Sequence, residues 1–260
     1  KRFSTIMDSQ IRNLDNKSLD DAYTIAIRNG SQISNKIYFS PEDKRNLIES
    51  FSLADVQNFP KAIYRGVFLE GIAHGNISRK DALKISTSLR NSLGYRSIGK
   101  DEYINQQRIQ LNEGEKVIVQ VKSKVNNSAY VSWFNIGGNN PKDQAMAMLI
   151  DTFIGQPYSM ELRTNQQLGY IVAAGAFSRS TYSSMYFIIQ SDGYPADVVQ
   201  KKSLTFLDKI KDELIENITV EQFSTYKAAV EERINEKSTS IFEEAKKRFR
   251  LAFEFDNNYN

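Results

Sequence analysis

The feature that most constrains the fold is a change in hydrophobic periodicity near residue 98. Before this point, apolar residues recur every three or four positions, which is typical of amphipathic helices. After it, short apolar segments alternate with turn residues, which is typical of antiparallel strands. Runs of such strands followed by helices favour an α+β fold, with helices layered on an antiparallel sheet. We therefore expect an α+β domain that follows a mostly helical segment.

The first part of the chain carries clear helix signals. Apolar residues at helical spacing predict one helix over residues 3–14 and a second over 19–27, which the Asn29-Gly30 pair is expected to end. Three serines are each followed by an aspartate three positions later, and a Ser side chain in this pattern accepts a hydrogen bond from a free N–H of the first helical turn. The three pairs are Ser40 with Asp43, Ser52 with Asp55, and Ser78 with Asp81.

One segment of the first part, residues 67–73, is typical of a strand rather than a helix. A strand without a neighbour leaves its backbone groups unpaired, so this one is expected to join a sheet contributed from elsewhere. We therefore interpret residues 1–98 as the C-terminal segment of a preceding domain and residues 99–260 as a second, α+β domain.

The second part is predicted to contain five strands and three helices. Short turns separate the first three strands, which implies antiparallel neighbours. The strands are expected at 103–111, 116–123, 129–137, 170–177 and 184–191, and the helices at 142–167, 196–216 and from Thr219 onward.

Composition excludes several classes of function. The 34 Lys and Arg residues are nearly balanced by 31 Asp and Glu residues and are scattered, so nucleic-acid binding is not expected. No apolar run approaches the roughly 18 residues of a membrane helix. With no Cys and one His, at position 74, the chain cannot form a zinc site built on two histidines. His74 is interpreted as a turn residue.

The most unusual stretch joins the helix predicted at 142–167 to the strand predicted at 170–177. Arg163 and Tyr170 are seven residues apart, about two helical turns, so they can emerge on the same side of this junction. The residues alone leave two interpretations open. One is a functional pair; the other is an ordinary cationic helix end beside a half-buried tyrosine.

A family resemblance bears on this choice. Residues 161–172, ELRTNQQLGYIV, resemble the R-x-x-x-Q-L-G-Y segment in the C-terminal half of the pitrilysin and insulin-degrading enzyme family, the inverted-motif (H-x-x-E-H) zinc metallopeptidases. Residues 69–77 and 187–191 resemble the segments on either side. The family usually has Glu at the position of Gln166, which is a departure outside the Arg and Tyr positions.

The resemblance implies a four-domain peptidase whose two halves close around peptide substrates, with zinc in the first domain. This chain would match the end of the third domain and most of the fourth, without the last helix and strand. It would bind no zinc and be inactive by itself, and would serve the N-terminal catalytic half of the same polypeptide. Arg163 would hold the substrate backbone, and Tyr170 would donate a hydrogen bond to the oxyanion.

Three further expectations follow from this resemblance. The parent enzyme would be periplasmic or secreted. An alternative function is a non-catalytic peptide-binding or assembly module on the same fold. Because the last strand would be missing, the sheet is expected to have open edges, which either pair with a second copy of the chain or lie against a helix or a neighbouring molecule.

Overall fold

The computed structural model describes residues 2–94, 96–99, 102, 108–109, 111–138, 140–179 and 182–254, without the side chains of 214–216 and 254. Its contacts divide the chain into two compact units. The first unit comprises residues 1–15, 35–109 and 238–260, and the second comprises 16–34 and 110–237. These two units are defined by contacts within the structure. The division into residues 1–98 and 99–260 refers instead to two domains of the family, and it stays a prediction.

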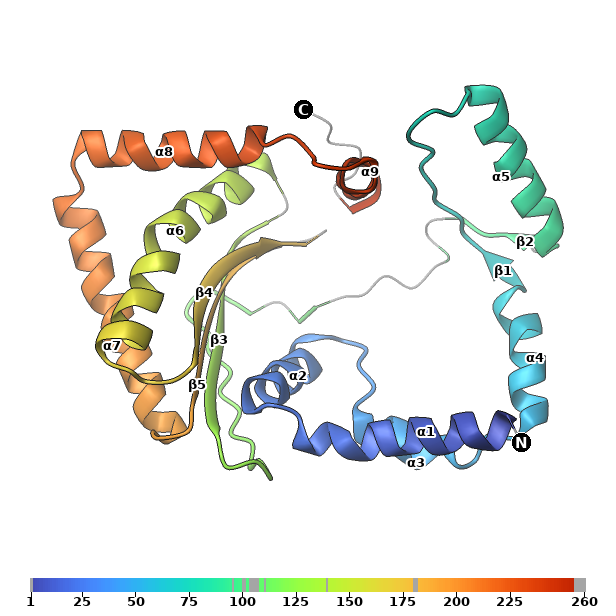
Figure 1. Ribbon diagram of the computed structural model, residues 1–260, viewed down its shortest axis with the longest axis horizontal. Coiled ribbons are helices and arrows are strands. Elements are labelled where there is room, and N and C mark those ends of the chain that lie inside the picture. Colours follow the sequence, from blue (N-terminus) through green and yellow to red (C-terminus); the bar gives the residue numbers. More distant parts are fainter. Residues whose placement is uncertain are drawn as a thin grey trace. The chain divides into compact units, whose positions relative to one another are not determined.

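The second unit is built on an antiparallel three-stranded sheet (Figure 1). Its strands are β3 (Ser128–Gly137), β4 (Ile171–Ser178) and β5 (Ser183–Ser191), in the order β3-β5-β4. The expected strands at 129–137, 170–177 and 184–191 are thereby confirmed, and the fold is α+β as the periodicity predicts.

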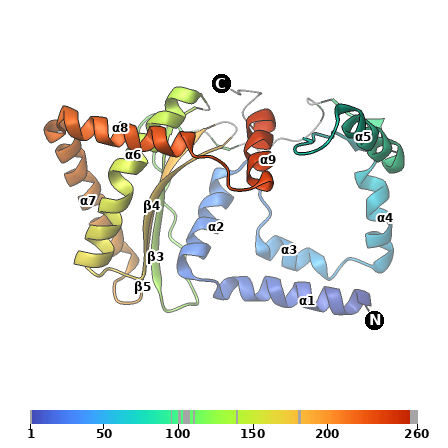
Figure 2. The same ribbon diagram turned by 45° about the horizontal axis from the view of Figure 1, so that its top comes forward.

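Helices cover both faces of this sheet (Figure 2). Helices α6 (Pro141–Ser159) and α7 (Ala196–Asn217) pack on one face, and α2 (Ala22–Ser34) packs on the other against β3 and β5. Helix α8 (Val220–Asn235) packs on α6, where the rings of Tyr226 and Phe153 are tilted at 54° with their centroids 4.2 Å apart.

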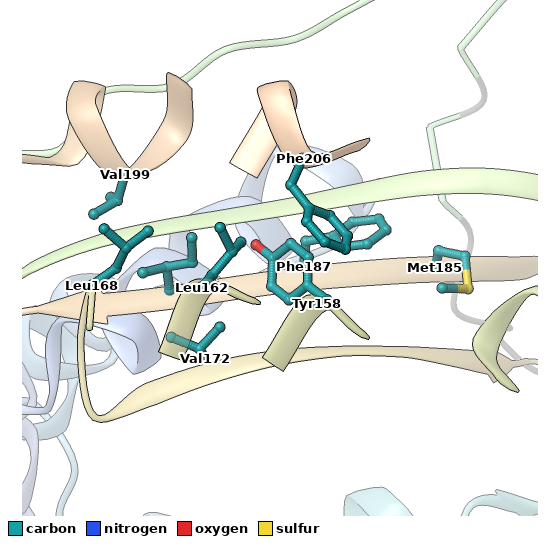
Figure 3. Packing of buried hydrophobic residues seen from close by; sticks show 9 residues of the cluster. Tyr158, Leu162, Leu168, Val172, Met185, Phe187, Val199 and Phe206 are labelled. Carbon is teal, nitrogen blue, oxygen red and sulfur yellow. The ribbon is translucent and has the colours of Figure 1, made fainter. Parts of the chain in front are cut away.

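The hydrophobic core of the unit lies between the sheet and helices α6 and α7 (Figure 3). Phe187 of β5 lies at its centre, with its ring 5.2 Å from that of Tyr158 in α6, and the Tyr158 ring is 5.4 Å from that of Phe206 in α7. The Tyr158 hydroxyl and Ser203 Oγ, both fully buried, are 2.8 Å apart. Strand alternation places Met185, Phe187 and Ile189 on this face.

The expectation that the Asn29-Gly30 pair ends a helix is wrong, because α2 continues to Ser34. A Cβ on Gly30 would lie 2.3 Å from the Trp133 ring of β3. Gly30 therefore allows the helix to approach the sheet, and this close packing outweighs the low helix propensity of glycine.

The first unit consists mainly of helices, and the three serine caps are confirmed. Ser40 and Ser52 form complete capping boxes with Asp43 and Asp55. The helices are α1 (Arg2–Asn16), which ends in the second unit just before the short helix η1 (Lys17–Leu19), then α3 (Pro41–Ile48), α4 (Leu53–Ile63), α5 (Arg79–Leu93), α9 (Ile241–Phe249) and the π-helix η3 (Arg250–Glu254).

Two expected strands differ from the structure. Only Gly66–Val67 (β1) forms a strand near 67–73, in a parallel pair with Arg96–Ser97 (β2). Residues 116–123 form no strand, and most of 103–111 lies outside the described residues. Residues 67–73 and 116–123 both have a strand-like composition. A strand, however, needs a neighbour that accepts and donates its backbone hydrogen bonds.

The helix expected from Thr219 onward is divided. It begins at Val220 with a Thr219 cap, ends at Asn235, and is followed by α9, which has its own cap at Ser240. Ser240 Oγ accepts a hydrogen bond from the Glu243 N–H. The Ser-x-x-Glu pattern in the sequence was the available signal for this second start.

Candidate functional site at the end of helix α6

The candidate site begins where α6 changes its hydrogen-bonding pattern. The helix expected over 142–167 is α-helical only to Ser159, and Met160–Asn165 form a π-helix, η2. Pro157 lies within α6 just before this change, and a proline removes one N–H donor and crowds the preceding turn. The π-helix shifts the last helical residues relative to a regular α-helix, so their directions depend on this irregularity.

A left-handed residue reverses the chain after η2. Gln167 has a φ of 51°, and the N–H of Leu168 then donates to the Leu162 carbonyl at 2.9 Å. This resembles a Schellman ending that is one residue wider because of the π-helix. Leu162 and Leu168 are 0% and 2% exposed and lie side by side in the core (Figure 3), which fixes the reversal.

Gly169 holds the next residue close to strand β5. A Cβ at this position would lie 1.9 Å from the carbonyl oxygen of Gln190, so a larger residue requires the backbone to move. The Gln190 side chain is also engaged, because its Oε1 accepts a hydrogen bond from the backbone N–H of Tyr23 at 3.1 Å. Buried contacts therefore define where Tyr170 leaves the core. Sequence reasoning did not identify Gln190, whose role depends on the pairing of β4 with β5.

Arg163 and Tyr170 meet at the surface above these buried leucines. The guanidinium carbon of Arg163 is 5.0 Å from the centroid of the Tyr170 ring, and Tyr170 is 83% exposed. A cation–π contact at an exposed position contributes about 0.5–1 kcal/mol. Within the described part of the chain, neither the guanidinium nor the Tyr170 hydroxyl has a hydrogen-bonding partner. Both groups are therefore available to an external ligand.

The carboxylate of Glu161 is engaged by neighbours of the same turn. Gln166 Nε2 donates to it at 2.9 Å and Asn165 Nδ2 at 2.7 Å. The hydrogen bond from Gln166 and, to a lesser extent, that from Asn165 lower the pKa of Glu161 below its usual range. The amide of Gln166 can donate to Glu161, which a carboxylate at this position could not do. The departure from the family pattern at Gln166 thus has a local role.

The described residues offer no place for a metal. Among them, no group of three or more His, Cys, Asp or Glu side chains is arranged to hold an ion. His74 lies exposed in the irregular segment after β1. The side chains of the described residues therefore do not fit a zinc site.

Comparisons with known proteins cover nearly the whole chain. Residues 149–249 match the family model of the PQQ synthase PqqF-like C-terminal lobe, domain 4. A nardilysin-like protein of Arabidopsis thaliana is 25% identical over 253 residues, 94% of this chain and 24% of the relative. The insulin-degrading enzyme of Homo sapiens is 22% identical over 252 residues, 95% of this chain and 24% of the relative.

The solved structure of pitrilysin has the same fold, with a TM-score of 0.78 over 97% of this chain and 27% of that chain, at 18% identity. Along nearly its whole length, the chain is similar to members of the pitrilysin and insulin-degrading enzyme family. It spans about a quarter of the length of the curated relatives that it matches.

This similarity agrees with the segment from which the resemblance was inferred, since the domain 4 match includes both Arg163 and Tyr170. The roles of these two residues stay a prediction. No helix in the described ranges is long and apolar enough to cross a membrane.

Proposed function

We propose that this chain is the C-terminal, substrate-contacting part of a zinc metallopeptidase that cleaves peptides in a closed chamber. The catalytic metal would be held by the N-terminal half of the same polypeptide. The observation that carries the proposal is the Arg163–Tyr170 pair, in which the guanidinium carbon lies 5.0 Å from the centroid of an exposed tyrosine ring, above the buried Leu162 and Leu168. A pair that served only to end a helix would not need an exposed tyrosine hydroxyl.

Tyr170 would act on the transition state. Its hydroxyl would donate a hydrogen bond to the oxyanion that forms when water attacks the peptide carbonyl. Because this charge exists only in the transition state, the hydroxyl would contribute to kcat and little to substrate affinity. The buried contacts of Leu168 and Gly169 support this role, since oxyanion stabilisation requires a donor with a fixed position.

Arg163 would act on the bound substrate. Its planar guanidinium carries five donors in a fork that suits two carbonyl oxygens or a carboxylate. The Tyr170 ring beneath it would hold the fork in place without using any of its donors. Arg163 would therefore contribute to affinity as well as to kcat.

Steady-state kinetics of the full-length protein test both roles. We expect Tyr170→Phe to lower kcat by about 10²–10³ with KM nearly unchanged. We expect Arg163→Ala to raise KM as well as to lower kcat, and Arg163→Lys to recover only part of the loss, because it keeps the charge but not the fork.

Matched controls are available in the same unit. Arg179 lies over the ring of Phe177 at 5.5 Å, so Arg179→Ala removes a similar contact elsewhere. Tyr194, 41% exposed, supplies a control hydroxyl in Tyr194→Phe. Unchanged kcat in Tyr170→Phe would show that the residue is structural.

The sequence encoded upstream in the same reading frame distinguishes the peptidase from the alternative, a non-catalytic peptide-binding or assembly module, without kinetics. An H-x-x-E-H motif upstream in the same reading frame, with a further Glu, supports the peptidase, and its absence supports the module. We keep a periplasmic or secreted location as part of the proposal; fractionation of cells that express the full-length protein tests it.

A further inference from the structure

Three hydrogen bonds join the two ends of the π-helical turn that carries Arg163. The backbone N–H of Gln166 donates to the Glu161 carbonyl at 2.9 Å, and Gln166 Nε2 donates to the Glu161 carboxylate at 2.9 Å. Asn165 Nδ2 donates to the other oxygen of the same carboxylate at 2.7 Å. Both carboxylate oxygens are therefore engaged. We call the Glu161 carboxylate and the side-chain amides of Asn165 and Gln166 the clasp.

The clasp needs one acid and one amide at positions 161 and 166. The Oε1 atom of Gln166 is buried and has no hydrogen-bonding partner in the described part of the chain, whereas Nε2 reaches the carboxylate. Exchanging the two atoms would bring an amide oxygen against an oxygen of Glu161, and neither atom could donate. A second ionised carboxylate at position 166 would likewise leave the pair without a donor.

The clasp favours a π-helical turn over an α-helical one. Its side-chain hydrogen bonds add to the backbone bond from Gln166 to Glu161, which spans five residues instead of four. Such turns are rare and occur mostly singly within α-helices. A π-helical turn holds one residue more, and one residue corresponds to a rotation of about 100° around the helix axis. A return to α-helical bonding would therefore redirect the side chains of this turn.

Arg163 lies inside the turn that the clasp spans. Its guanidinium carbon is 5.0 Å from the centroid of the Tyr170 ring, which is 83% exposed. A cation–π contact at an exposed position is weak, so it does not by itself fix a long side chain. The backbone of the turn must therefore direct Arg163 toward the ring.

Positive charge from a neighbouring helix strengthens the clasp. Lys202 and Lys209 of α7 favour the ionised form of Glu161, and Lys209 Nζ also lies 3.6 Å from Glu213 Oε1 within α7. Hydrogen bonds that an ionised carboxylate accepts are shorter and stronger than those between neutral groups.

We propose that Glu161 is a positioning residue for the reaction: through the clasp it holds the π-helical turn, and the turn directs the Arg163 guanidinium onto the Tyr170 ring. This inference rests on the proposed function, in which Arg163 acts on the bound substrate. It assigns the direction of Arg163 to a carboxylate that is itself engaged by two amides.

Steady-state kinetics of two variants of the full-length protein test the inference. Gln166→Glu places two carboxylates in the clasp, whereas Glu161→Gln combined with Gln166→Glu restores one acid and one amide with their positions exchanged. We expect Gln166→Glu to lower kcat/KM at about pH 8 by about tenfold, with a higher KM and a lower kcat. The double variant should be at least about fivefold more active than Gln166→Glu.

The comparison of these two variants isolates the clasp. A carboxylate at position 166 buries its second oxygen in both variants, so this cost cancels in their ratio. Equal activities of the single and double variants at about pH 8 would overturn the inference.

The pH profile identifies repulsion in the clasp as the cause. Two neighbouring carboxylates titrate as a pair, and a proton shared between them restores a donor. Relative to the unaltered protein at the same pH, Gln166→Glu should regain activity as the pH falls from about 8 to about 5.5. The double variant should change much less. A constant ratio between the two variants over this range would contradict the inference.

A combination with Arg163→Ala tests whether the clasp acts through Arg163. In a chain that already lacks the guanidinium, Gln166→Glu should lower kcat/KM by less than about twofold. The same loss with and without Arg163 would indicate a general structural role and overturn the inference. If Gln166→Glu does not fold, Glu161→Ala takes its place, because it removes both acceptor oxygens without adding a charge; its loss of activity should depend on Arg163 in the same way.

Failure of this inference can be told apart from failure of the proposed function. If Arg163→Ala impairs peptide cleavage but Gln166→Glu does not, the clasp has no positioning role and the proposed function stands. If the protein cleaves no peptide, the proposed function fails, and NMR of the full-length protein labelled with ¹⁵N-arginine tests the clasp alone. The Arg163 side-chain signal, identified by its loss in Arg163→Lys, should move in Gln166→Glu and return in the double variant. An unmoved signal would overturn the inference.

Discussion

At the scale of single residues, the candidate site depends on an unfavourable backbone conformation. Gln167 is the non-glycine residue with positive φ among the described residues, at 51°. For an L-residue this conformation costs about 1–2 kcal/mol, because Cβ approaches the following carbonyl oxygen. The burial of Leu162 and Leu168 on either side compensates for this cost. The position of Tyr170 thus rests on strain that neighbouring contacts hold in place.

Replacing this residue tests the strain. We expect Gln167→Gly to raise the free energy of unfolding by about 0.5–1 kcal/mol, since glycine adopts positive φ readily but loses more chain entropy on folding. Gln167→Val should lower it, because a β-branched residue tolerates this conformation poorly. Urea denaturation of both variants measures the difference. A less stable Gly variant would mean that the Gln167 side chain makes a stabilising contact of its own.

At the scale of elements, one buried polar contact connects two helices across the core. The Tyr158 hydroxyl of α6 and Ser203 Oγ of α7 are 2.8 Å apart and have no exposed surface. Burial raises the pKa of Tyr158 far above its usual range, so the hydroxyl stays neutral and can donate or accept. This contact fixes α7 over the segment that leads to the candidate site.

We expect Tyr158→Phe to lower the free energy of unfolding by about 1–3 kcal/mol, because it leaves Ser203 Oγ buried without a partner. Combining it with Ser203→Ala should recover part of the loss, since neither polar group then remains. A double-mutant cycle by denaturant titration measures the coupling. Additive effects would show that the two hydroxyls do not stabilise each other.

The turn at the end of η2 predicts a pH dependence. Hydrogen bonds from Gln166 and Asn165 lower the pKa of Glu161 in the folded protein. A group whose folded pKa is depressed stabilises the protein above its unfolded pKa, and this contribution is lost as pH falls through the folded pKa. We expect the gap in melting temperature between the unaltered protein and Glu161→Gln to be larger at about pH 7 than at about pH 3. A gap that does not vary with pH would argue against this role.

At the scale of the whole molecule, the proposed function assigns to this chain contacts to a reaction rather than a complete catalytic centre. It has one His and no Cys, whereas catalytic zinc normally has three protein ligands that include His. We expect the isolated chain to bind no stoichiometric zinc and to cleave no peptide. Equilibrium dialysis with zinc, followed by metal analysis, checks the first point. Hydrolysis that a chelator abolishes would contradict the second.

The amino-acid sequence by itself determined features that depend on local contacts. Ser40, Ser52 and Ser78 cap helices because a cap needs only residues three positions apart. The R-x-x-x-Q-L-G-Y segment carried the family resemblance and singled out Arg163 and Tyr170, whose guanidinium and ring lie together in the structure.

Only the tertiary structure decided features that depend on a distant partner. Gly30 lies inside a helix rather than at its end. Glycine is needed there because the Trp133 ring occupies the space where a side chain would be. Residues 116–123 have a strand-like sequence but form no strand, because pairing requires a neighbouring strand. Gly169 is explained by the carbonyl of Gln190, twenty-one positions later in the chain, which approaches only because β4 pairs with β5. Backbone hydrogen bonds and close packing between distant segments leave no local pattern from which they can be predicted.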